Sequence, residues 1–539
     1  MEDIRISNTC FLWLTVLATA ASSVVAGRKL VHYFQLESYQ FPGYFRTLRR
    51  NLPGTLVPSA ALYAVQLALI AAFGWCVKSG WLHGAVAGLL LAALSLGAAW
   101  YIRMLTVEKK AKKPLVFTPR VKRLYAVSAV VYTLSLAGLR ALVGETWVWL
   151  GLFPVLLPLW VALAGLLAWP IEKLISEMYF RDAQRMLRER PDLIKIGITG
   201  SYGKTSVKFI LGTLLSEKYQ TLVTPSSFNT PMGVTKIIRT KLQPAHQVFV
   251  AEMGARHVGD IREMCRLVHP TYGVLTSVGP QHLDTFKTIE RIKKTKYELM
   301  DAIPPEGCCF FPDDGDICRE LYDRTEKDKR LCCVHPGDAD VWAEDITVSP
   351  AGSNFLLCTK DDRIRCETRL LGEHNIQNIL LAATVCLRLN MTLKQIVRGI
   401  SRLEPVEHRL QLIPSTGVTI IDDAFNSNPR GAQAALEVLR QFSGRRIIIT
   451  PGMVELGGEE AAFNRAFGRK MASCADVAIL VGRRHTQPIA EGLREEGFPE
   501  ENIHPVGSLT DAAALLRILG RAGDVALFEN DLPDNYSET

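Results

Sequence analysis

Lys195-Ile-Gly-Ile-Thr-Gly-Ser-Tyr-Gly-Lys-Thr-Ser-Val-Lys208 is the stretch of sequence that decides the fold. The apolar run at 193–198 predicts a buried strand, and a tight turn of small residues follows it. From Lys204 onward, apolar residues recur at helical spacing. A strand, a glycine turn and a helix in this order place backbone N–H groups and the positive end of a helix dipole around one point. The stretch therefore predicts a binding site for a polyphosphate.

The glycine loop has the short form T-G-x-x-G-K-T-S, because Ile198 stands where the common phosphate-binding loop has its first glycine. Lys204 is expected to reach the β- and γ-phosphates, and the Thr205 hydroxyl is expected to bind Mg²⁺. A chance glycine turn before a helix is the alternative interpretation. The candidate nucleotide-binding residues of the loop are Thr199, Gly200, Ser201, Gly203, Lys204, Thr205 and Ser206.

Five apolar segments precede the loop, and each is close to the roughly 20 residues that a bilayer core requires. Buried helices of a soluble domain are the alternative, but five such runs in succession cannot all be covered by protein. The segments lie at about 9–26, 57–77, 81–102, 124–143 and 147–169. We therefore predict an α-helical membrane domain.

The charges of the connecting loops predict its orientation. The loops after the first and third segments are rich in Lys and Arg, whereas those after the second and fourth are short. Basic loops favour the cytoplasm, so the chain after the fifth segment is expected there and the N-terminus outside. The first segment could instead be a cleaved signal peptide, although Glu2 and Asp3 make its start acidic. The basic loops could also bind anionic lipid or a lipid pyrophosphate rather than only fix topology.

Composition supports a membrane part joined to an intracellular part. The 539 residues are 48% apolar, with the excess in the first 170 positions, and the net charge is +8. The 12 cysteines include no C-x-x-C spacing, so we expect reduced thiols and no zinc site. Basic and aromatic residues do not alternate outside the membrane loops, so nucleic-acid binding is not expected.

Strands and helices alternate after the glycine loop, which indicates a doubly wound parallel sheet. A predicted strand from Val248 contains Glu252 near its end, and another from Tyr272 is followed by Gly-Pro-Gln-His282. Because ligands bind at the carboxyl ends of such strands, Glu252 and His282 are expected beside the glycine loop. Alternatively, Glu252 could be an ordinary surface carboxylate, and His282 could cap a helix.

Seven motifs in this order resemble the Mur ligase family, the ATP-dependent amide ligases of peptidoglycan synthesis, and most of all the D-alanyl-D-alanine-adding MurF branch. The resemblance covers about residues 191–520. The motifs are TGSYGKTS at 199–206, NTPMG at 229–233, AEMGA at 251–255, GPQHLD at 279–284, KYE at 296–298, GEHNIQN at 372–378 and DDAFNSNP at 422–429.

The resemblance implies both fold and reaction. It implies a central P-loop domain with a mostly parallel sheet and a C-terminal Rossmann-like α/β domain. The implied enzyme is an ATP-dependent, ADP-forming ligase that joins a carboxylate to an amine through an acyl phosphate. The implied substrates are UDP-N-acetylmuramoyl-tripeptide and D-alanyl-D-alanine.

The resemblance also assigns catalytic and metal-binding roles by position. Lys204 would bind the γ-phosphate, Thr205 and Glu252 would hold one Mg²⁺, and His282 would hold a second. Lys296 stands where many members carry a carbamylated lysine, which gives a cation carboxylate-like oxygen ligands. A solvated helix lysine is the alternative for Lys296.

Further positions match residues that contact nucleotide or substrate in the family. Arg409 would reach ATP across the cleft, and Asp423 would contact ribose or phosphate. Asn426 and Asn428 would lie near the amine, although a hydrogen-bonded turn explains them as well. Asn375 and Asn378 would meet adenine, and Asn229 and Thr230 would lie near the acceptor and the phosphates.

Several departures from the family leave the acceptor and the amine open. A membrane domain replaces the UDP-sugar-binding domain, His408 replaces the usual glycine before Arg409, PGMVELG at 451–457 lacks an aspartate, and FENDLPDNY at 528–536 replaces a basic end. One alternative is a membrane-anchored ligase that acts on a different, for example lipid-linked, carboxylate. Another is a non-catalytic membrane scaffold switched by nucleotide, which would tolerate substitution of His282 and Lys296.

We therefore expect a multi-pass protein of the cell membrane whose catalytic domains are cytoplasmic. The expected domains are a membrane domain of about five helices at 1–170, an amphipathic connector at 171–190, a central ATP-binding domain at 191–400 and a C-terminal domain at 401–539.

Overall fold

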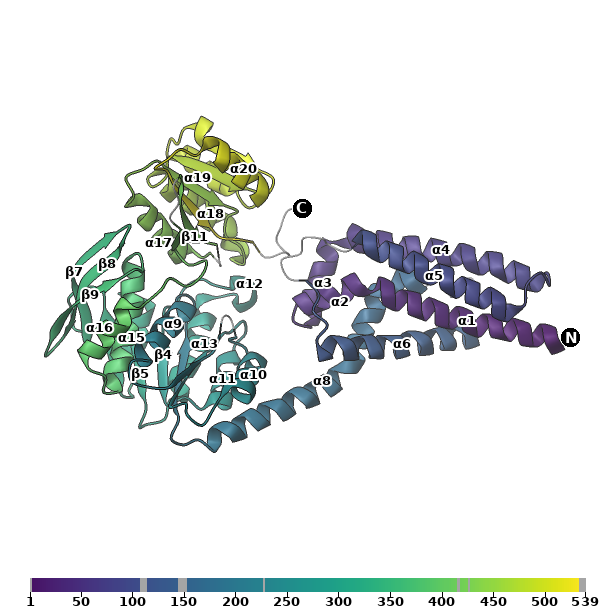
Figure 1. The fold of residues 1–539 in the computed structure, drawn as a ribbon, viewed down its shortest axis with the longest axis horizontal. Coiled ribbons are helices and arrows are strands. Elements are labelled where there is room, and N and C mark those ends of the chain that lie inside the picture. Colours follow the sequence, from purple (N-terminus) through teal and green to yellow (C-terminus); the bar gives the residue numbers. More distant parts are fainter. Residues whose placement is uncertain are drawn as a thin grey trace. The chain divides into compact units, whose positions relative to one another are not determined.

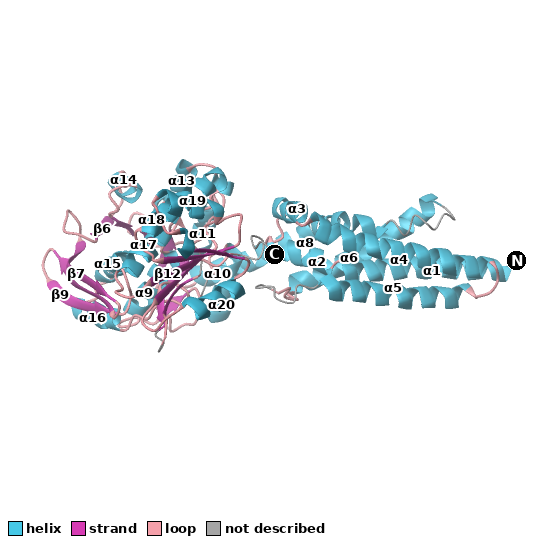
Figure 2. Cartoon of the chain, turned by 90° about the horizontal axis from the view of Figure 1, so that it is seen from above, coloured by secondary structure: helices cyan, strands magenta, loops and turns pink. Residues whose placement is uncertain are grey.

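A computed structural model describes residues 2–106, 114–143, 153–225, 228–413, 417–424 and 427–532 (Figure 1). The chain forms two compact units, Met1–Glu177 and Met178–Thr539. In its described part, the first unit is helical, and the strands lie in the second (Figure 2). The boundary falls within helix α8 (Leu157–Arg188), which continues without a break from the fifth apolar segment into the expected connector.

Long apolar helices make up the first unit. Five stretches within the described residues are long and apolar enough to cross a membrane: Arg5–Ala26, Leu52–Lys78, Gly84–Thr106, Pro119–Ala141 and Phe153–Arg188. Residues 147–152 of the expected fifth segment lie outside the described residues. The helices are α1 (Glu2–Ala26), α2 (Arg28–Leu36), α3 (Phe41–Arg50), α4 (Leu52–Lys78), α5 (Gly84–Thr106), α6 (Pro119–Val143), the 3-10 turn η1 (Phe153–Leu156) and α8.

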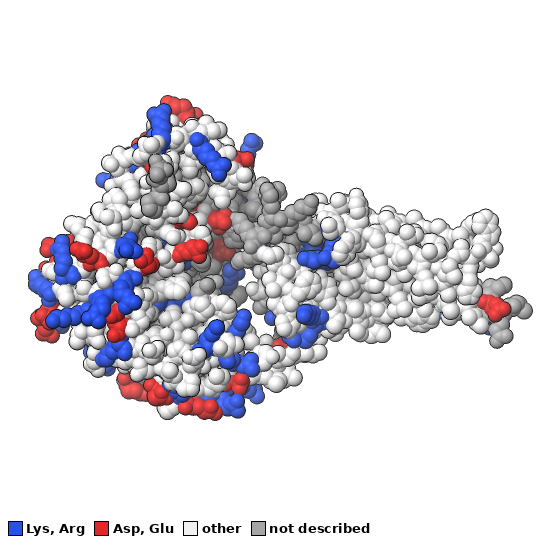
Figure 3. Space-filling model, viewed as in Figure 1, with Lys and Arg blue, Asp and Glu red and all other residues white. Residues whose placement is uncertain are grey.

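The outward faces of these helices are apolar. Leu89, Leu94 and Leu134 are 62%, 51% and 67% exposed. The face of this unit seen in Figure 3 is almost free of charge along the helices and carries Lys and Arg at one end. Such a surface is suited to lipid rather than water.

A nine-stranded sheet, in the order β2-β3-β1-β4-β5-β6-β7-β8-β9, organises the middle domain. It is parallel from β2 to β7 and antiparallel from β7 to β9. The strands are β1 (Ile194–Thr199), β2 (Thr221–Val223), β3 (Val248–Glu252), β4 (Tyr272–Leu275), β5 (Cys308–Pro312), β6 (Lys329–Cys333), β7 (Val341–Ser349), β8 (Gly352–Thr359) and β9 (Arg363–Thr368). The predicted, mostly parallel sheet is confirmed.

Helices cover both faces of this sheet because successive strand residues point to opposite sides. Val248 and Val250 pack in the core that includes residues of α9, α15 and α16, whereas Phe249 and Ala251 pack with α10, α11 and α13. The helices are α9 (Lys204–Leu215), α10 (Pro231–Lys241), α11 (Asp260–Val268), α12 (Leu283–Phe286), α13 (Ile289–Ala302), α14 (Ile317–Asp323), α15 (Glu373–Arg388) and α16 (Leu393–Ser401).

The C-terminal domain has a second sheet, in the order β10-β11-β15-β12-β13-β14, which is parallel except for β10. This confirms the expected Rossmann-like α/β domain. Its strands are β10 (Gln411–Ile413), β11 (Thr419–Asp423), β12 (Arg446–Thr450), β13 (Val477–Val481), β14 (Ile503–Val506) and β15 (Val525–Glu529). Its helices are α17 (Pro429–Arg440), η2 (Gly457–Glu459), α18 (Glu460–Ala472), α19 (Gln487–Glu495), η3 (Glu500–Asn502) and α20 (Leu509–Leu519).

Candidate active site

The glycine loop joins β1 to α9 and is supported by the segment that follows β4. The Ser201 amide donates to the Ser277 carbonyl oxygen (2.6 Å), and the Ser201 hydroxyl donates to that of Gly279 (3.0 Å). Thr199, which ends β1, donates its hydroxyl proton to the Met253 carbonyl oxygen (3.0 Å). Gly203 precedes α9 with a φ of 77°. The loop is therefore fixed by contacts to the ends of both strands that flank β1.

Lys204 folds back over this loop. Its Nζ donates to the carbonyl oxygens of Gly200 (2.7 Å) and Ser201 (2.8 Å). Burial lowers the pKa of Lys204 to about 8, with Glu252 opposing this shift and Arg409 adding to it.

Thr205 and Glu252 meet as predicted. The Thr205 hydroxyl lies 3.1 and 3.2 Å from the two carboxylate oxygens of Glu252, and the Asn229 amide nitrogen donates to one of them at 3.1 Å. Lys208, a residue that the sequence analysis missed, contacts Glu252 with its Nζ at 2.8 Å and is fully buried. Burial alone would raise the pKa of Glu252, but Lys208 and Lys204 outweigh it and lower that pKa.

The Thr205–Glu252 pair fits one magnesium ion. A hydroxyl and a carboxylate are the hard oxygen donors that Mg²⁺ prefers, and Mg²⁺ takes its remaining ligands from water and substrate phosphates. Across the described ranges, no three His, Cys, Asp or Glu side chains form a ready-made metal cage. Ligation at this site would therefore draw on the phosphates of a nucleotide.

His282 contacts a residue that was not predicted from the sequence. Its Nδ1 lies 2.6 Å from Oε2 of Glu455, which belongs to the PGMVELG segment of the C-terminal domain. Among the described residues, Glu455 is the side-chain partner that the structure gives His282. Glu455 was not predicted from the sequence, because nothing in the PGMVELG segment indicates that its carboxylate meets a histidine 173 positions away.

Lys296 lies within α13 and is only 2% exposed, which rules out the solvated helix lysine. Burial lowers its pKa well below the usual value, and Lys204 adds to this, while Asp260, Glu298 and Glu252 oppose it. Lys296 is therefore a buried amine that is neutral more readily than an exposed lysine.

A pocket of about 190 Å³ opens between the glycine loop and the C-terminal domain. Burial lowers the pKa of Arg409 at its wall, with Asp423 opposing the shift, and burial raises the pKa of Asp423 to about 6. The predicted residues that line the pocket together are Gly203, Ser206, Asn375, Asn378, Arg409, Asp423 and Asn428. The pocket wall combines these polar and charged groups with apolar side chains such as Phe209, Leu370 and Leu403.

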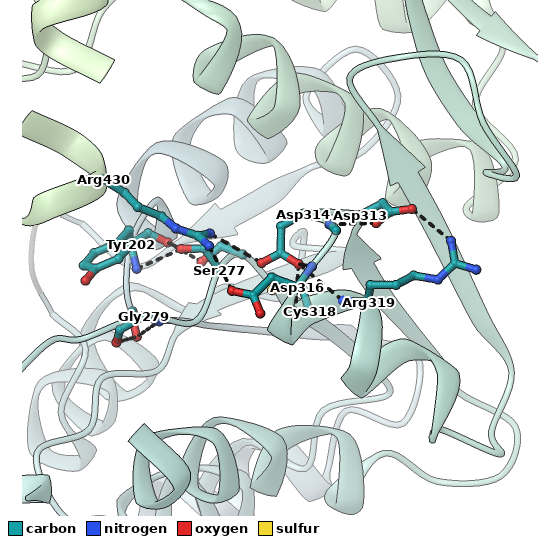
Figure 4. Close-up of polar contacts among 12 residues, drawn as sticks. Tyr202, Ser277, Gly279, Asp313, Asp314, Asp316, Cys318, Arg319 and Arg430 are labelled. Atoms are coloured by element: carbon teal, nitrogen blue, oxygen red, sulfur yellow. Dashed lines mark hydrogen bonds and ion pairs between the residues drawn. The ribbon is translucent and has the colours of Figure 1, made fainter. Parts of the chain in front are cut away.

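Ion pairs that the sequence analysis missed join the two domains at this pocket (Figure 4). Arg430 of α17 reaches Asp314 (3.4 Å) and Asp316 (3.5 Å), which follow β5. Arg430 also lines the pocket with Tyr202 and Ser277. The aspartates stand in a local Asp-Asp-Gly-Asp turn, and no local pattern shows which cation meets them.

Two of the residues predicted near the substrates, Thr230 and Asn428, cap helices. Thr230 caps α10 by accepting from the Gly233 amide (3.3 Å), and Asn428 caps α17 by accepting from the Gly431 amide (2.9 Å). The hydrogen-bonded turn therefore exists at Asn428, which nevertheless lines the pocket. Asn426 lies outside the described residues.

The two segments that depart from the family lie together. Thr450, next to Pro451, donates to Glu529 (2.8 Å), and the side-chain amide of Asn530 donates to the Gly452 carbonyl oxygen (2.6 Å). The Ser427 hydroxyl also contacts Glu529. The buried carboxyl of Glu529 therefore lies against Thr450 and Ser427.

Comparison with known proteins agrees with this geometry. The family description "Mur ligase middle domain" matches residues 198–386, and "Mur ligase, glutamate ligase domain" matches 408–529. The UDP-N-acetylmuramoyl-tripeptide–D-alanyl-D-alanine ligase of Mycobacterium bovis is 31% identical over 356 residues, which cover 62% of this chain and 69% of that protein.

Solved structures give the same result. The crystal structure of MurF from Acinetobacter baumannii has 26% identity and a TM-score of 0.61, covering 67% of this chain and 79% of that one. The MurF ligase of Thermotoga maritima in complex with ADP has the same fold, with 24% identity and a TM-score of 0.60. The match covers 67% of this chain and 82% of that one. The chain therefore belongs to the Mur ligase family, and its middle and C-terminal domains are similar to those of MurF.

Proposed function

We propose that this chain joins a carboxylate to an amine and converts ATP to ADP and phosphate. The observation that carries the proposal is one pocket lined by Gly203 and Ser206 of the middle domain and Arg409 of the C-terminal domain, with the Thr205–Glu252 contact at the start of the adjoining helix α9. Two anions, a carboxylate and a triphosphate, can react there because cationic groups surround the point where they meet.

The reaction proceeds in two steps. A carboxylate oxygen attacks the γ-phosphorus, ADP leaves, and an acyl phosphate forms. The amine then attacks the acyl carbon, phosphate leaves with the original carboxylate oxygen, and a proton is released. Lys204 and Arg409 offset the negative charge that accumulates on the transferred phosphoryl group. Mg²⁺ held by Thr205 and Glu252 would supply further positive charge at the β- and γ-phosphates.

Lys296 is the proposed site of carbamylation. A lowered pKa leaves more of its amine neutral, and the neutral amine is the form that adds to CO₂. The new N–C bond forms as the nitrogen loses a proton, and the resulting carbamate has two oxygens suited to a second cation. His282 would be the protein's nitrogen donor for that cation.

The proposed substrates are UDP-N-acetylmuramoyl-tripeptide and D-alanyl-D-alanine, after which the similar ligase of Mycobacterium bovis is named. We place the reaction at the cytoplasmic face of the cell membrane, because five helices of the first unit have the length and composition of membrane spans. A lipid-linked carboxylate is the second candidate. The observation that favours it is that the family match begins at residue 198, after these helices.

The test is ADP release by the purified full-length protein with muramoyl peptides, lipid-linked precursors and D-amino-acid dipeptides in every pairing. Sustained ADP release over many turnovers should require both a carboxylate and an amine, and Lys204→Ala should abolish it. ADP formation by Lys204→Ala, or no turnover with any pair, would overturn the proposal and favour a nucleotide-switched scaffold.

A further inference from the structure

His282 and Glu455 come from different domains and contact each other close to the glycine loop. His282 lies three positions beyond Gly279, whose carbonyl oxygen accepts the Ser201 hydroxyl bond. The distance from His282 Nδ1 to Glu455 Oε2 is 2.6 Å, and the two side chains are 19% and 24% exposed. A carboxylate accepts, so Nδ1 carries the proton and donates it.

Glu455 also faces a second residue of the middle domain. Its Oε1 lies 4.0 Å from a guanidinium nitrogen of Arg256. Arg256 follows β3 and His282 follows β4, and these strands lie on either side of β1 in the sheet. One carboxylate of the C-terminal domain therefore reaches the loops on both sides of the phosphate-binding strand. This arrangement requires the two domains to be close together.

The backbone at this contact is unusual. His282 has a φ of 53° and Glu455 a φ of 66°. Residues with a side chain adopt this left-handed region uncommonly, and where they do, the surrounding structure holds them in it. The surrounding structure therefore holds both contact residues in a backbone conformation that residues with side chains adopt uncommonly.

We propose that Glu455 is a positioning residue that fixes the His282 ring when the C-terminal domain closes over the nucleotide. With Nδ1 engaged, Nε2 is the ring nitrogen that a cation beside the phosphates would meet, as in carboxylate–histidine pairs that orient metal ligands. The cation-binding side of the site is then complete only in the closed state. The inference rests on the proposed function, because it assigns His282 a ligand near ATP.

A matched contact provides the control. Glu460 lies 2.8 Å from Nδ1 of His485, with comparable exposure, but both residues belong to the C-terminal domain. Glu460→Ala removes the same kind of contact without affecting the link between the domains.

The first test is hydrogen exchange of the full-length protein in detergent, with and without Mg²⁺ and a non-hydrolysable ATP analogue. In the unaltered protein, segments 199–206 and 279–287 should both become protected. Glu455→Ala should keep protection at 199–206 and lose it at 279–287, whereas Glu460→Ala should keep both. Retained protection at 279–287 in Glu455→Ala would overturn the inference. A lack of protection at 199–206 in the unaltered protein would instead count against ATP binding and the proposed function.

The second test is the Mg²⁺ dependence of turnover. Glu455→Ala should raise the Mg²⁺ concentration for half-maximal rate at least fivefold, and Glu455→Gln, which keeps an acceptor oxygen, should restore most of the loss. If Glu455→Ala does not fold, Glu455→Asp takes its place, because it keeps the charge but shortens the reach. In a His282→Ala background, Glu455→Ala should not raise the Mg²⁺ concentration for half-maximal rate any further. Equal effects in both backgrounds would show that the two residues act independently and would overturn the inference.

Discussion

At the scale of single residues, the site depends on how Glu252 is held. Thr205, Asn229 and Lys208 all contact its carboxylate, and both Glu252 and Lys208 are buried. Lys208 follows Lys204 by one helical turn, and in the sequence it resembles an exposed helix lysine. The sequence could not reveal its burial, because the acid that pairs with it lies 44 positions away.

Lys208→Met should destabilise the protein by about 3 kcal/mol, because it leaves a buried carboxylate without its closest cation. The control is Lys293→Met, since Lys293 pairs with the half-exposed Glu320 and such a pair contributes about 1 kcal/mol or less. Denaturant unfolding of each variant measures the difference. Equal stability of the two variants would contradict the role given to Lys208.

Glu529 predicts a pH dependence of stability. Burial raises its pKa to about 7, from an ordinary 4.5, so the folded state holds this proton more tightly than the unfolded state. The stability that this bound proton adds to the folded state is fully present below pH 4.5 and is lost as the pH rises to about 7. This change amounts to about 3 kcal/mol.

Glu529→Gln should remove this dependence, because the amide keeps the shape and does not ionise. Relative to the unaltered protein, the variant should gain stability steadily between pH 4.5 and 7 and then remain level. Thermal unfolding over this range measures the gain. Parallel curves for the two proteins would show that Glu529 is not held protonated.

At the scale of elements, the strand–glycine loop–helix unit was predictable because its pattern is local. Within about 20 residues, an apolar run predicts β1, glycines predict the loop, and apolar residues at helical spacing predict α9. The antiparallel strands β7–β9 were not predicted, because their pairing depends on contacts outside each strand. The Glu455–His282 and Arg430–Asp314 contacts were not predictable either, since their partners are 173 and 116 positions apart.

Gly200 is the residue of this unit that should tolerate change least. Its φ is 153°, and a Cβ there would lie 2.1 Å from the Thr276 hydroxyl oxygen and 2.9 Å from the Ser277 carbonyl oxygen. Gly200→Ala should therefore displace the loop and weaken binding of an ATP analogue at least tenfold. Gly458→Ala, where a Cβ meets nothing within 4 Å, should leave binding unchanged. Normal binding by Gly200→Ala would contradict the close approach of the loop to residues 276–277.

At the scale of the whole molecule, hydropathy and motifs together indicated a ligase joined to membrane helices. The ligase fold is confirmed by the two sheets and by the similarity to MurF. The five apolar helices are present, and their place in a membrane remains our proposal.

Removing the first unit tests this proposal. The full-length protein should stay with membranes through an alkaline carbonate wash, because exposed leucines such as Leu89 and Leu134 would face lipid. Residues 178–539 should remain in the supernatant and still bind an ATP analogue. Release of the full-length protein by the wash would contradict a membrane-spanning first unit.

Oxygen transfer from substrate to phosphate is the most direct test of the central claim, that the cleft activates a carboxyl group as an acyl phosphate. UDP-N-acetylmuramoyl-tripeptide labelled with ¹⁸O in its terminal carboxylate would be incubated with ATP, D-alanyl-D-alanine and the full-length protein. Mass spectrometry should find one ¹⁸O atom in each phosphate released. Amide formation with unlabelled phosphate, or ADP release that needs neither substrate, would contradict the account.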